Sequence, residues 1–409
     1  MSRSVANVSA PAPNRAAVLW FCWLGWVFDF YDLILFSFCK RTIASDLGLD
    51  PTGSVAWIEG ASLFATAVGG FAFGRWADRR GRRPALVLSI VVYSLGALLT
   101  GLATGPWTLL LARCLTGLGV GGEWGIGHAV VAEHWSGPAR DRAHAVLQAG
   151  SPVGMALAAA MAFFVAPLPA VGWRVVFCGS AALGLLALWA RRALPGPDRA
   201  VAGQPPLPAK LLWAPTHRRS SALLLTILAL HMAGFWCVYA ELPAALIARH
   251  GVTAGEVGWF QLQVNSVHVV ADLGFGVLAA RFGRRPVFAA CCLLFAAGHL
   301  LVLQQLEHAT ADFAAFTVAA MAMGLGAGTW SCFGALFGEQ FPPALRATAA
   351  ATSYALARSV QLPLKPALAS AMHEASFAPA LWLGTACATL SALLVFALPR
   401  RTTALPTPN

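Results

Sequence analysis

Long apolar segments alternate with short polar ones along almost the whole chain. Each apolar segment has about the 20 residues that an α-helix needs to cross a bilayer. The pattern predicts an all-α membrane protein with twelve transmembrane helices. Their expected boundaries are 17–38, 54–75, 85–104, 107–133, 143–166, 172–192, 221–243, 255–280, 286–305, 310–338, 346–369 and 377–398.

The longest polar interval between these segments is rich in proline and basic residues, which indicates a linker between two six-helix bundles. The predicted parts are an N-terminal tail 1–16, a first bundle 17–192, a linker 193–220, a second bundle 221–398 and a C-terminal tail 399–409. A substrate site is then expected near the middle of the membrane, between the two bundles.

An internal repeat supports the two bundles. The loop after the second predicted helix reads Arg-Arg-Gly-Arg-Arg-Pro around Gly81, and the loop after the eighth reads Arg-Phe-Gly-Arg-Arg-Pro around Gly283. Glu133 precedes Arg140 by seven residues, as Glu339 precedes Arg346. Two matches at nearly one offset predict two halves of similar structure.

Composition and charge agree with a bilayer environment. The chain is 58% hydrophobic and 11% charged, whereas soluble domains carry about 25% charged residues. With the N-terminus inside, 21 of the 28 Lys and Arg fall in cytoplasmic segments and four in outer loops, namely Lys40, Arg41, Arg174 and Arg249. The positive-inside rule therefore predicts cytoplasmic termini in a plasma membrane, expected to be a bacterial inner membrane. Because the basic residues lie in membrane loops, the net charge of +11 does not indicate nucleic-acid binding.

Sequence motifs for catalysis or bound cofactors are missing. There is no P-loop, HExxH or GxSxG motif, and no CxxC pair among the nine cysteines. We therefore expect neither an enzyme nor a disulfide, metal or cofactor, and we expect a monomer.

Charged residues inside the predicted helices of the first bundle are the sharpest functional signal, because each is costly in a membrane unless it is paired or hydrated. Asp32 and Arg113 both lie about 9 Å below the outer surface, so an ion pair is available between them. This pair is expected either to couple transport to protons or to be purely structural. Two further residues are candidates to carry the proton. They are Asp29, one turn from Asp32, and Glu123, among the glycines of the predicted helix 107–133.

In the second bundle, four polar residues of the predicted helix 255–280 recur on one helical face, which predicts that they line a cavity or contact another helix. They are Gln261, Asn265, His268 and Asp272. Arg358, near the middle of the predicted helix 346–369, is expected to bind a carboxylate or to pair with a protein carboxylate such as Asp272. Lys365 is expected to extend to the outer surface. Trp236, Tyr239 and Trp330 are candidates to line the substrate site, as is Arg113.

The segment Gly74-Arg75-Trp76-Ala77-Asp78-Arg79-Arg80-Gly81-Arg82-Arg83 resembles the signature loop of the major facilitator superfamily. Phe30-Tyr31-Asp32, Gly121-Gly122-Glu123-Trp124-Gly125, Leu147-Gln148-Ala149-Gly150 and Gly172-Trp173-Arg174 resemble its sialate:proton and lactate/pyruvate:proton symporters. The run Arg113-xxx-Gly117-x-Gly119 also resembles sugar porters and the metabolite:proton symporters. Unlike the first-half loop, the second-half loop has Ala280 before Arg281 and no acidic residue.

The resemblance implies residues that close the inner side of the transporter. Asp78 is expected to bond helix N-termini and neighbouring arginines when that side is shut, and Glu133 with Arg140 and Glu339 with Arg346 to form matching clamps. The expected gating residues are Asp78, Arg79, Arg82, Arg83, Glu133, Arg140, Glu339 and Arg346. The alternative to a gating role is that these eight residues are solvated loop charges, whose exposed pairs contribute little to stability.

The function expected from these features is proton-coupled uptake of a small organic anion, such as a monocarboxylate or acidic sugar, by alternating access. The proton gradient is the driving force, and the partners are the anion, protons and the lipid bilayer. A drug or metabolite exporter and a neutral sugar porter remain alternatives within transport. A transporter-like sensor is a remote alternative, because the tails and the linker leave little room for a signalling domain.

Overall fold

A computed structural model describes most of the chain, and within that part all regular structure is helical. Eight of its helices are long and apolar enough to cross a membrane. Counting helices separated by a short break as one, the described segments make twelve passes, the number that the sequence predicts. The residues described are 15–51, 53–165, 172–183, 209–239, 241–243, 245–246, 252–307, 313–374 and 377–400.

The first six passes form the N-terminal group of helices. They consist of α1 (Arg15–Leu47), α2 (Ser54–Arg80), α3 (Arg82–Gly101), α4 (Pro106–His134), α5 (Gly137–Gln148), α6 (Gly150–Val165), α7 (Gly172–Ser180) and the 3₁₀ turn η1 (Ala181–Leu183). The expected linker 193–220 lies largely outside the described residues, which resume with η2 (Ala209–Trp213).

The last six passes form the C-terminal group. They consist of α9 (Arg218–Val238), α11 (Ala254–Phe282), α12 (Arg284–Glu307), α13 (Phe313–Ala327), η3 (Gly328–Ser331), α14 (Cys332–Gln340), α15 (Pro343–Ser359), α16 (Gln361–Glu374), α17 (Ala378–Leu394) and η4 (Val395–Ala397).

Several helices differ from the predicted spans. α1 continues to Leu47, well beyond the expected end at residue 38, so Lys40 and Arg41 lie on a helix rather than in a loop. The fifth, tenth and eleventh passes are each interrupted, at Ala149, at η3 and at Val360. Hydropathy marks the apolar part of a pass, and therefore it misses polar helical ends and short internal breaks.

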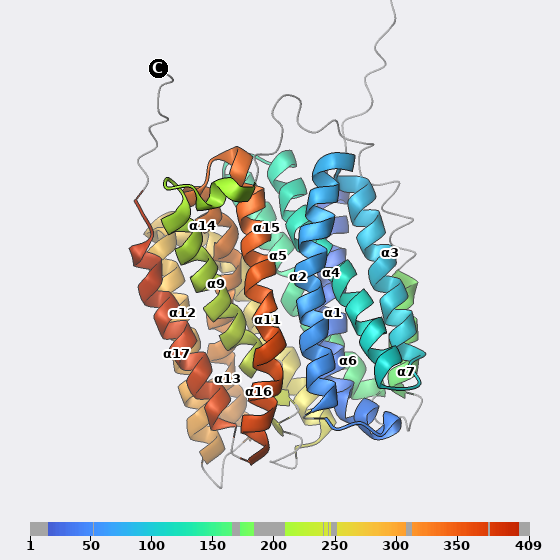
Figure 1. Cartoon of the computed structure of the whole chain (residues 1–409). Helices are drawn as coiled ribbons and strands as arrows, with labels where there is room; N and C mark the ends of the chain where they lie inside the picture. Colours follow the sequence, from blue (N-terminus) through green and yellow to red (C-terminus); the bar gives the residue numbers. More distant parts are fainter. Residues whose placement is uncertain are drawn as a thin grey trace, which may run out of the picture.

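The helices run side by side, and the two groups lie beside each other (Figure 1). α1 to α7, in blue to green, occupy one side, and α9 to α17, in green to red, occupy the other. Across the boundary, α2 packs on α15 and α16, while α6 packs on α11. We call the end with the connection between α2 and α3 (residues 80–82) the α2–α3 end. The opposite end, with the connection between α1 and α2 (residues 47–54), is the α1–α2 end.

Glycines allow α4 to approach its neighbours closely. Gly117 and Gly121 face the α2 carbonyl oxygens of Ser62 and Thr66, and Gly119 faces the α3 backbone at Tyr93. A Cβ atom at any of the three would overlap the neighbouring backbone. This is the small-residue packing typical of membrane helices. This packing holds α4, which carries Arg113 and Glu123, close to α2 and α3.

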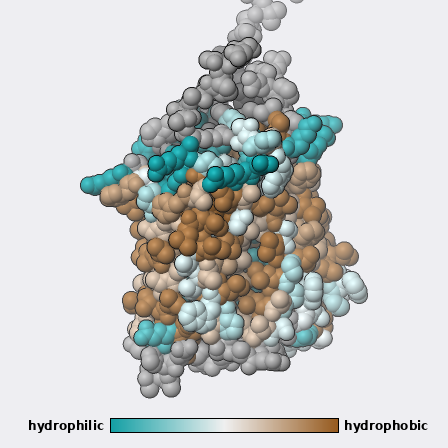
Figure 2. All heavy atoms as spheres, turned by 60° about the vertical axis from the view of Figure 1, so that its left-hand side comes forward, coloured by the Kyte–Doolittle hydropathy of each residue, from teal (hydrophilic) through white to brown (hydrophobic). Residues whose placement is uncertain are grey.

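The surface has the polarity of a membrane protein. On the face drawn in Figure 2, hydrophobic side chains form a broad band across the middle of the molecule, and hydrophilic residues gather near the α2–α3 end. Large apolar residues with exposed side chains include Leu111, Val270, Val277 and Val318. An apolar surface of this extent requires lipid, since soluble monomers rarely expose one.

Candidate functional site

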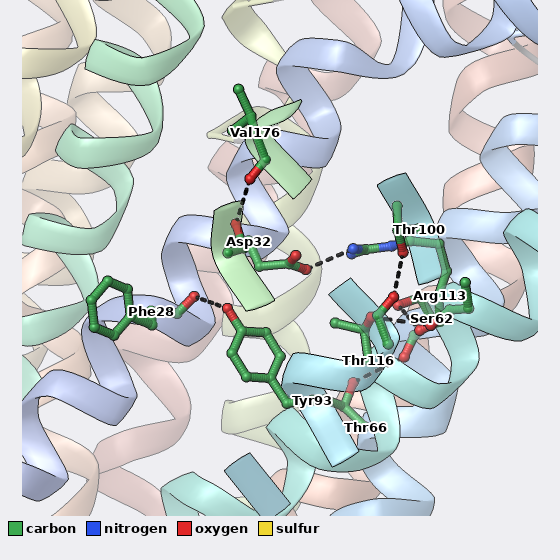
Figure 3. Close-up of polar contacts among 12 residues, drawn as sticks. Phe28, Asp32, Ser62, Thr66, Tyr93, Thr100, Arg113, Thr116 and Val176 are labelled. Carbon is green, nitrogen blue, oxygen red and sulfur yellow. Dashed lines mark hydrogen bonds and ion pairs between the residues drawn. The ribbon is translucent and has the colours of Figure 1, made fainter. Parts of the chain in front are cut away.

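Asp32 on α1 and Arg113 on α4 form a buried ion pair. Arg113 Nη1 lies 2.6 Å from Asp32 Oδ2, and neither side chain is more than 1% exposed. The two groups face each other between the helices (Figure 3). The ion pair that the sequence made available is therefore formed in the structure. Removing one partner of such a pair costs about 3–5 kcal/mol, because the other charge is left buried and alone.

The surroundings of Arg113 are mostly aromatic. Its guanidinium carbon lies 4.5 Å from the ring centre of Phe36 and 5.8 Å from that of Phe177. The pair itself uses only one oxygen and one nitrogen, and among the described residues Asp32 Oδ1 and Arg113 Nε have no hydrogen-bond partner. The pair thus retains capacity for one further bond on each side.

Asp29 and Glu123 are two more carboxyl groups in the same region. Asp29 is fully buried, and within the described part of the chain neither of its oxygens accepts a hydrogen bond. It interacts electrostatically with Glu123, Arg358 and Asp32. The Glu123 carboxylate packs against Gly25 of α1, where any side chain would displace it. The structure therefore places Asp29 within electrostatic reach of both Asp32 and Glu123.

Arg358 on α15 is buried between aromatic rings. Its Nη1 donates to the Tyr354 hydroxyl at 2.6 Å, and its guanidinium carbon lies 5.4 Å from the ring centres of both Tyr354 and Trp236. Among the described residues, its Nε and Nη2 have no hydrogen-bond partner. These two nitrogens form one edge of the guanidinium, and that edge matches the two oxygens of a carboxylate.

The polar face of α11 is buried as expected. All four residues are at most 4% exposed. Asn265 contacts Gln261 at 3.4 Å and Tyr239 at 3.3 Å. Asp272 accepts a 2.6 Å hydrogen bond from Ser331 and lies 3.6 Å from His268. These contacts join α11 to α9 and η3, so much of the stripe's hydrogen bonding is between helices of one group.

The predicted aromatic residues divide between two places. Trp236 contacts Arg358, whereas Trp330 packs on His231 at 4.8 Å. Asp272, a possible partner of Arg358 in the sequence, is instead bonded to Ser331. Arg358 donates to Tyr354 and has no acidic hydrogen-bond partner among the described residues, so the alternative pairing of Arg358 with Asp272 is wrong.

A cluster of four charged residues links the two groups at the α1–α2 end. We call Lys40, Glu59, Glu241 and Lys365 the Lys–Glu cluster. Lys365 lies 2.7 Å from Glu59 and 2.6 Å from Glu241, and its side chain is only 2% exposed. Lys40 lies 2.5 Å from Glu241. The prediction that Lys365 extends to the surface is therefore wrong, because two carboxylates hold its ammonium group inside the protein.

At the α2–α3 end, two equivalent ion pairs occupy the two groups. Glu133 pairs with Arg82 at 3.2 Å, and Glu339 with Arg284 at 3.0 Å. The expected clamp between Glu133 and Arg140 is not formed, because Arg140 donates to the carbonyl oxygen of Trp135 at 2.9 Å.

The remaining gating candidates are only partly described. Arg79 is exposed and Arg83 is half-buried. The side chains of Asp78 and Arg346 lie outside what the structure describes, so their expected contacts stay predictions.

Sequence reasoning missed several members of these sites. Glu59 and Glu241 lie inside predicted spans 54–75 and 221–243, so the rule applied to Asp32 would have found them. Tyr354 precedes Arg358 by four residues and therefore shares its helical face. Trp124 follows Glu123 and stacks on Tyr354 with ring centres 4.1 Å apart.

Comparison with known proteins agrees with this architecture. The sequence matches the Major Facilitator Superfamily twice, over residues 22–260 and 224–409. The chain belongs to this superfamily. This member is a multi-pass membrane transporter of small organic metabolites, and it is not an enzyme.

Its relatives transport several kinds of organic molecule. A probable 4-methylmuconolactone transporter of Cupriavidus pinatubonensis is 30% identical over 86% of this chain and 82% of the relative. A sialic acid transporter of Escherichia coli is 34% identical over 45% of this chain and 44% of the relative. The crystallised proton:xylose symporter shares the fold, with a TM-score of 0.75, 15% identity and coverage of 94% and 96% of the two chains.

Proposed function

We propose that this transporter takes up a small organic anion together with a proton, by alternating access. The observation that carries the proposal is the free edge of Arg358. A buried guanidinium with two unpaired donors is costly, and a carboxylate satisfies both donors at once. A neutral sugar offers no carboxylate to accept from both donors of this edge, which favours an organic acid over the neutral sugar alternative.

The proton is assigned to the acidic residues of α1. Asp32 is held by Arg113, and Asp29 lies near both Asp32 and Arg358. When a substrate carboxylate approaches Arg358, it adds negative charge beside Asp29, and like charges at close range favour protonation of one of them. Anion and proton therefore enter together in this scheme, with Asp29 and Asp32 as carriers and Glu123 as a further candidate.

The direction of transport follows from the proposed sidedness. The basic α2–α3 end and both termini are assigned to the cytoplasm, in a bacterial inner membrane. The Lys–Glu cluster then lies near the outer surface. An inward proton gradient drives the anion inward, which is uptake rather than export.

The test is proton movement with the anion in proteoliposomes that contain a pH indicator. The probes are 2-oxoglutarate and N-acetylneuraminate, which are ionised at neutral pH and cross lipid slowly. The expected result is that an inward gradient of one probe acidifies the lumen, and that a protonophore removes uphill accumulation. Protein-free liposomes and Arg358→Gln liposomes control for leakage. Anion entry without lumenal acidification, or acidification driven only by outward substrate movement, contradicts symport.

A further inference from the structure

Arg358 contacts two aromatic rings of the C-terminal group, and each of these stacks on a ring of the N-terminal group. Its guanidinium contacts Trp236 of α9 and Tyr354 of α15. Trp236 stacks on Phe30 of α1, with ring centres 6.0 Å apart and an angle of 23° between the rings. Tyr354 stacks on Trp124 of α4 at 13°. We call these four rings the aromatic arc. The arc brings aromatic rings of both groups together beside the proposed carboxylate site.

Buried donors without partners lie in and beside this arc. Trp124 is 5% exposed and Trp26 is 3% exposed, and the indole N–H of each has no hydrogen-bond partner among the described residues. Arg358 adds its Nε and Nη2. Buried donors normally have partners, because an unpaired one costs free energy. A set of donors that includes a fixed positive charge fits an anion.

We propose that the transported anion carries its carboxylate on a flat conjugated ring, and that Trp124 is a second donor to that carboxylate beside Arg358. This inference rests on the proposed function and specifies its substrate class. A planar ring stacks on aromatic side chains through its quadrupole and dispersion. A saturated sugar ring lacks that face and needs partners for its hydroxyl groups. The substrate determinants are therefore Arg358, Trp124 and the aromatic arc.

The experiment measures calorimetric binding to the purified full-length protein for four probes. Benzoate and cyclohexanecarboxylate have the same charge and ring size and differ in planarity. N-acetylneuraminate represents acidic sugars, and benzamide is the uncharged analogue of benzoate. Stacking on two rings predicts that benzoate binds roughly tenfold tighter than cyclohexanecarboxylate. Equal or weaker binding of benzoate overturns the ring proposal.

Trp124→Phe tests the second donor, because it keeps an aromatic ring and removes only the N–H. Loss of one hydrogen bond predicts up to about tenfold weaker benzoate binding, with benzamide little changed. Trp20→Phe, at an exposed tryptophan of α1, is the matched control and should bind like the unmodified protein. Unchanged benzoate binding by Trp124→Phe removes Trp124 from the site.

Failure of this inference can be separated from failure of the proposed function. If carboxylates bind, require Arg358 and show no preference for a planar ring, only the ring proposal is wrong. If benzamide binds as tightly as benzoate and Arg358→Gln changes neither, the anion proposal itself fails.

The Lys–Glu cluster carries a second, independent inference. Each helical group supplies one lysine and one glutamate. Pairs between the groups are Lys40 with Glu241 at 2.5 Å and Lys365 with Glu59 at 2.7 Å. Pairs inside a group are Lys365 with Glu241 at 2.6 Å and Lys40 with Glu59 at 3.7 Å. Unlike charges therefore alternate around a ring of four.

We infer that the Lys–Glu cluster is the gate of the α1–α2 end. When the two groups separate there, the pairs between groups break while each group keeps its own Lys–Glu pair. No charge is left alone in a part-buried site, which is the main cost of breaking a buried pair. The arrangement holds the closed state and still permits opening.

Two double variants with the same four residue types separate this gate from a purely structural cluster. In Lys40→Glu with Glu59→Lys, the pairs between groups become repulsive while each group keeps an attractive pair, so opening is favoured. In Glu59→Lys with Lys365→Glu, only the pairs between groups stay attractive, so opening is opposed. Both variants contain two attractive and two repulsive contacts when closed.

Hydrogen exchange of backbone amides in residues 54–62 and 361–374 reports the opening. The first variant is expected to exchange at least about tenfold faster than the second, which corresponds to about 1.4 kcal/mol between the two variants. The second should also slow substrate exchange across liposomes. Reversal of all four charges restores the alternation and should return both readouts toward those of the unmodified protein. Similar exchange in the two double variants means that the cluster only stabilises the fold, which overturns the gate.

Discussion

Asp32→Asn is expected to abolish uphill uptake of the anion while exchange of substrate across the membrane continues. Asparagine resembles a protonated aspartate, so the variant imitates the proton-loaded state permanently. The Asp32–Arg113 contact is 2.6 Å long and buried, and Arg113 loses its charged partner in this variant. Exchange needs only the loaded carrier, whereas net uptake requires the proton to be released inside the cell. Uptake and counterflow in proteoliposomes under an imposed proton gradient measure the two activities.

Asp46→Asn is the matched control for that variant. Asp46 is also on α1 and pairs with Arg174 at 2.8 Å, but both side chains are more than a quarter exposed. Exposed pairs contribute only about 0–1 kcal/mol, so this substitution should leave uphill uptake intact. If Asp32→Asn vesicles still accumulate substrate against its gradient, the proton is carried elsewhere, with Asp29 and Glu123 as the next variants to measure.

Arg358→Lys is expected to weaken anion binding although it keeps the positive charge. Lysine cannot present the two parallel donors of the guanidinium edge formed by Nε and Nη2. It also loses the planar contact with Trp236 and Tyr354. The loss of one charge-assisted hydrogen bond is about 1.5–3 kcal/mol, or about ten- to more than a hundredfold in dissociation constant. Calorimetric titration with the tightest-binding carboxylate measures it.

Arg281→Lys controls for general effects of replacing an arginine that lies on a ring. The guanidinium of Arg281 lies 5.3 Å from the Phe282 ring centre, on an exposed part of α11. It should leave the dissociation constant unchanged, whereas Arg358→Gln should be at least as harmful as Arg358→Lys because the charge is lost too. Equal affinity of Arg358→Lys and the unmodified protein excludes Arg358 as the anion-binding residue.

The number and type of helices could be predicted from local patterns, because each transmembrane pass needs its own apolar run. The depth of Asp32 and Arg113 could also be predicted, since rise per residue converts position in a helix into distance from the surface. Helix ends were less predictable. α1 extends to Leu47, and the prediction ended it too early because its last turns carry polar residues, which hydropathy does not count as membrane-spanning.

Partners of charged residues depended on how the helices pack. Glu133 is close to Arg140 in the sequence, yet it pairs with Arg82 from the neighbouring helix. The position of Lys365 in its predicted helix lets the side chain reach the outer surface. Glu59, more than 300 residues away in the chain, nevertheless holds it inside the protein. A flexible side chain takes the nearest countercharge in space, and distance along the chain does not report that.

The amino-acid sequence alone therefore establishes a twelve-pass, all-α transporter of the major facilitator superfamily with buried charges at given depths. It also places Arg358 near the middle of a predicted membrane pass, where a charge needs a partner. Only the folded chain determines that Arg358 contacts Trp236 and Tyr354 and keeps one edge unpaired among the described residues. The same holds for the two lysines and two glutamates that meet across the groups. Helical periodicity orders residues within one helix, whereas the rotation and neighbours of each helix follow from packing the whole bundle.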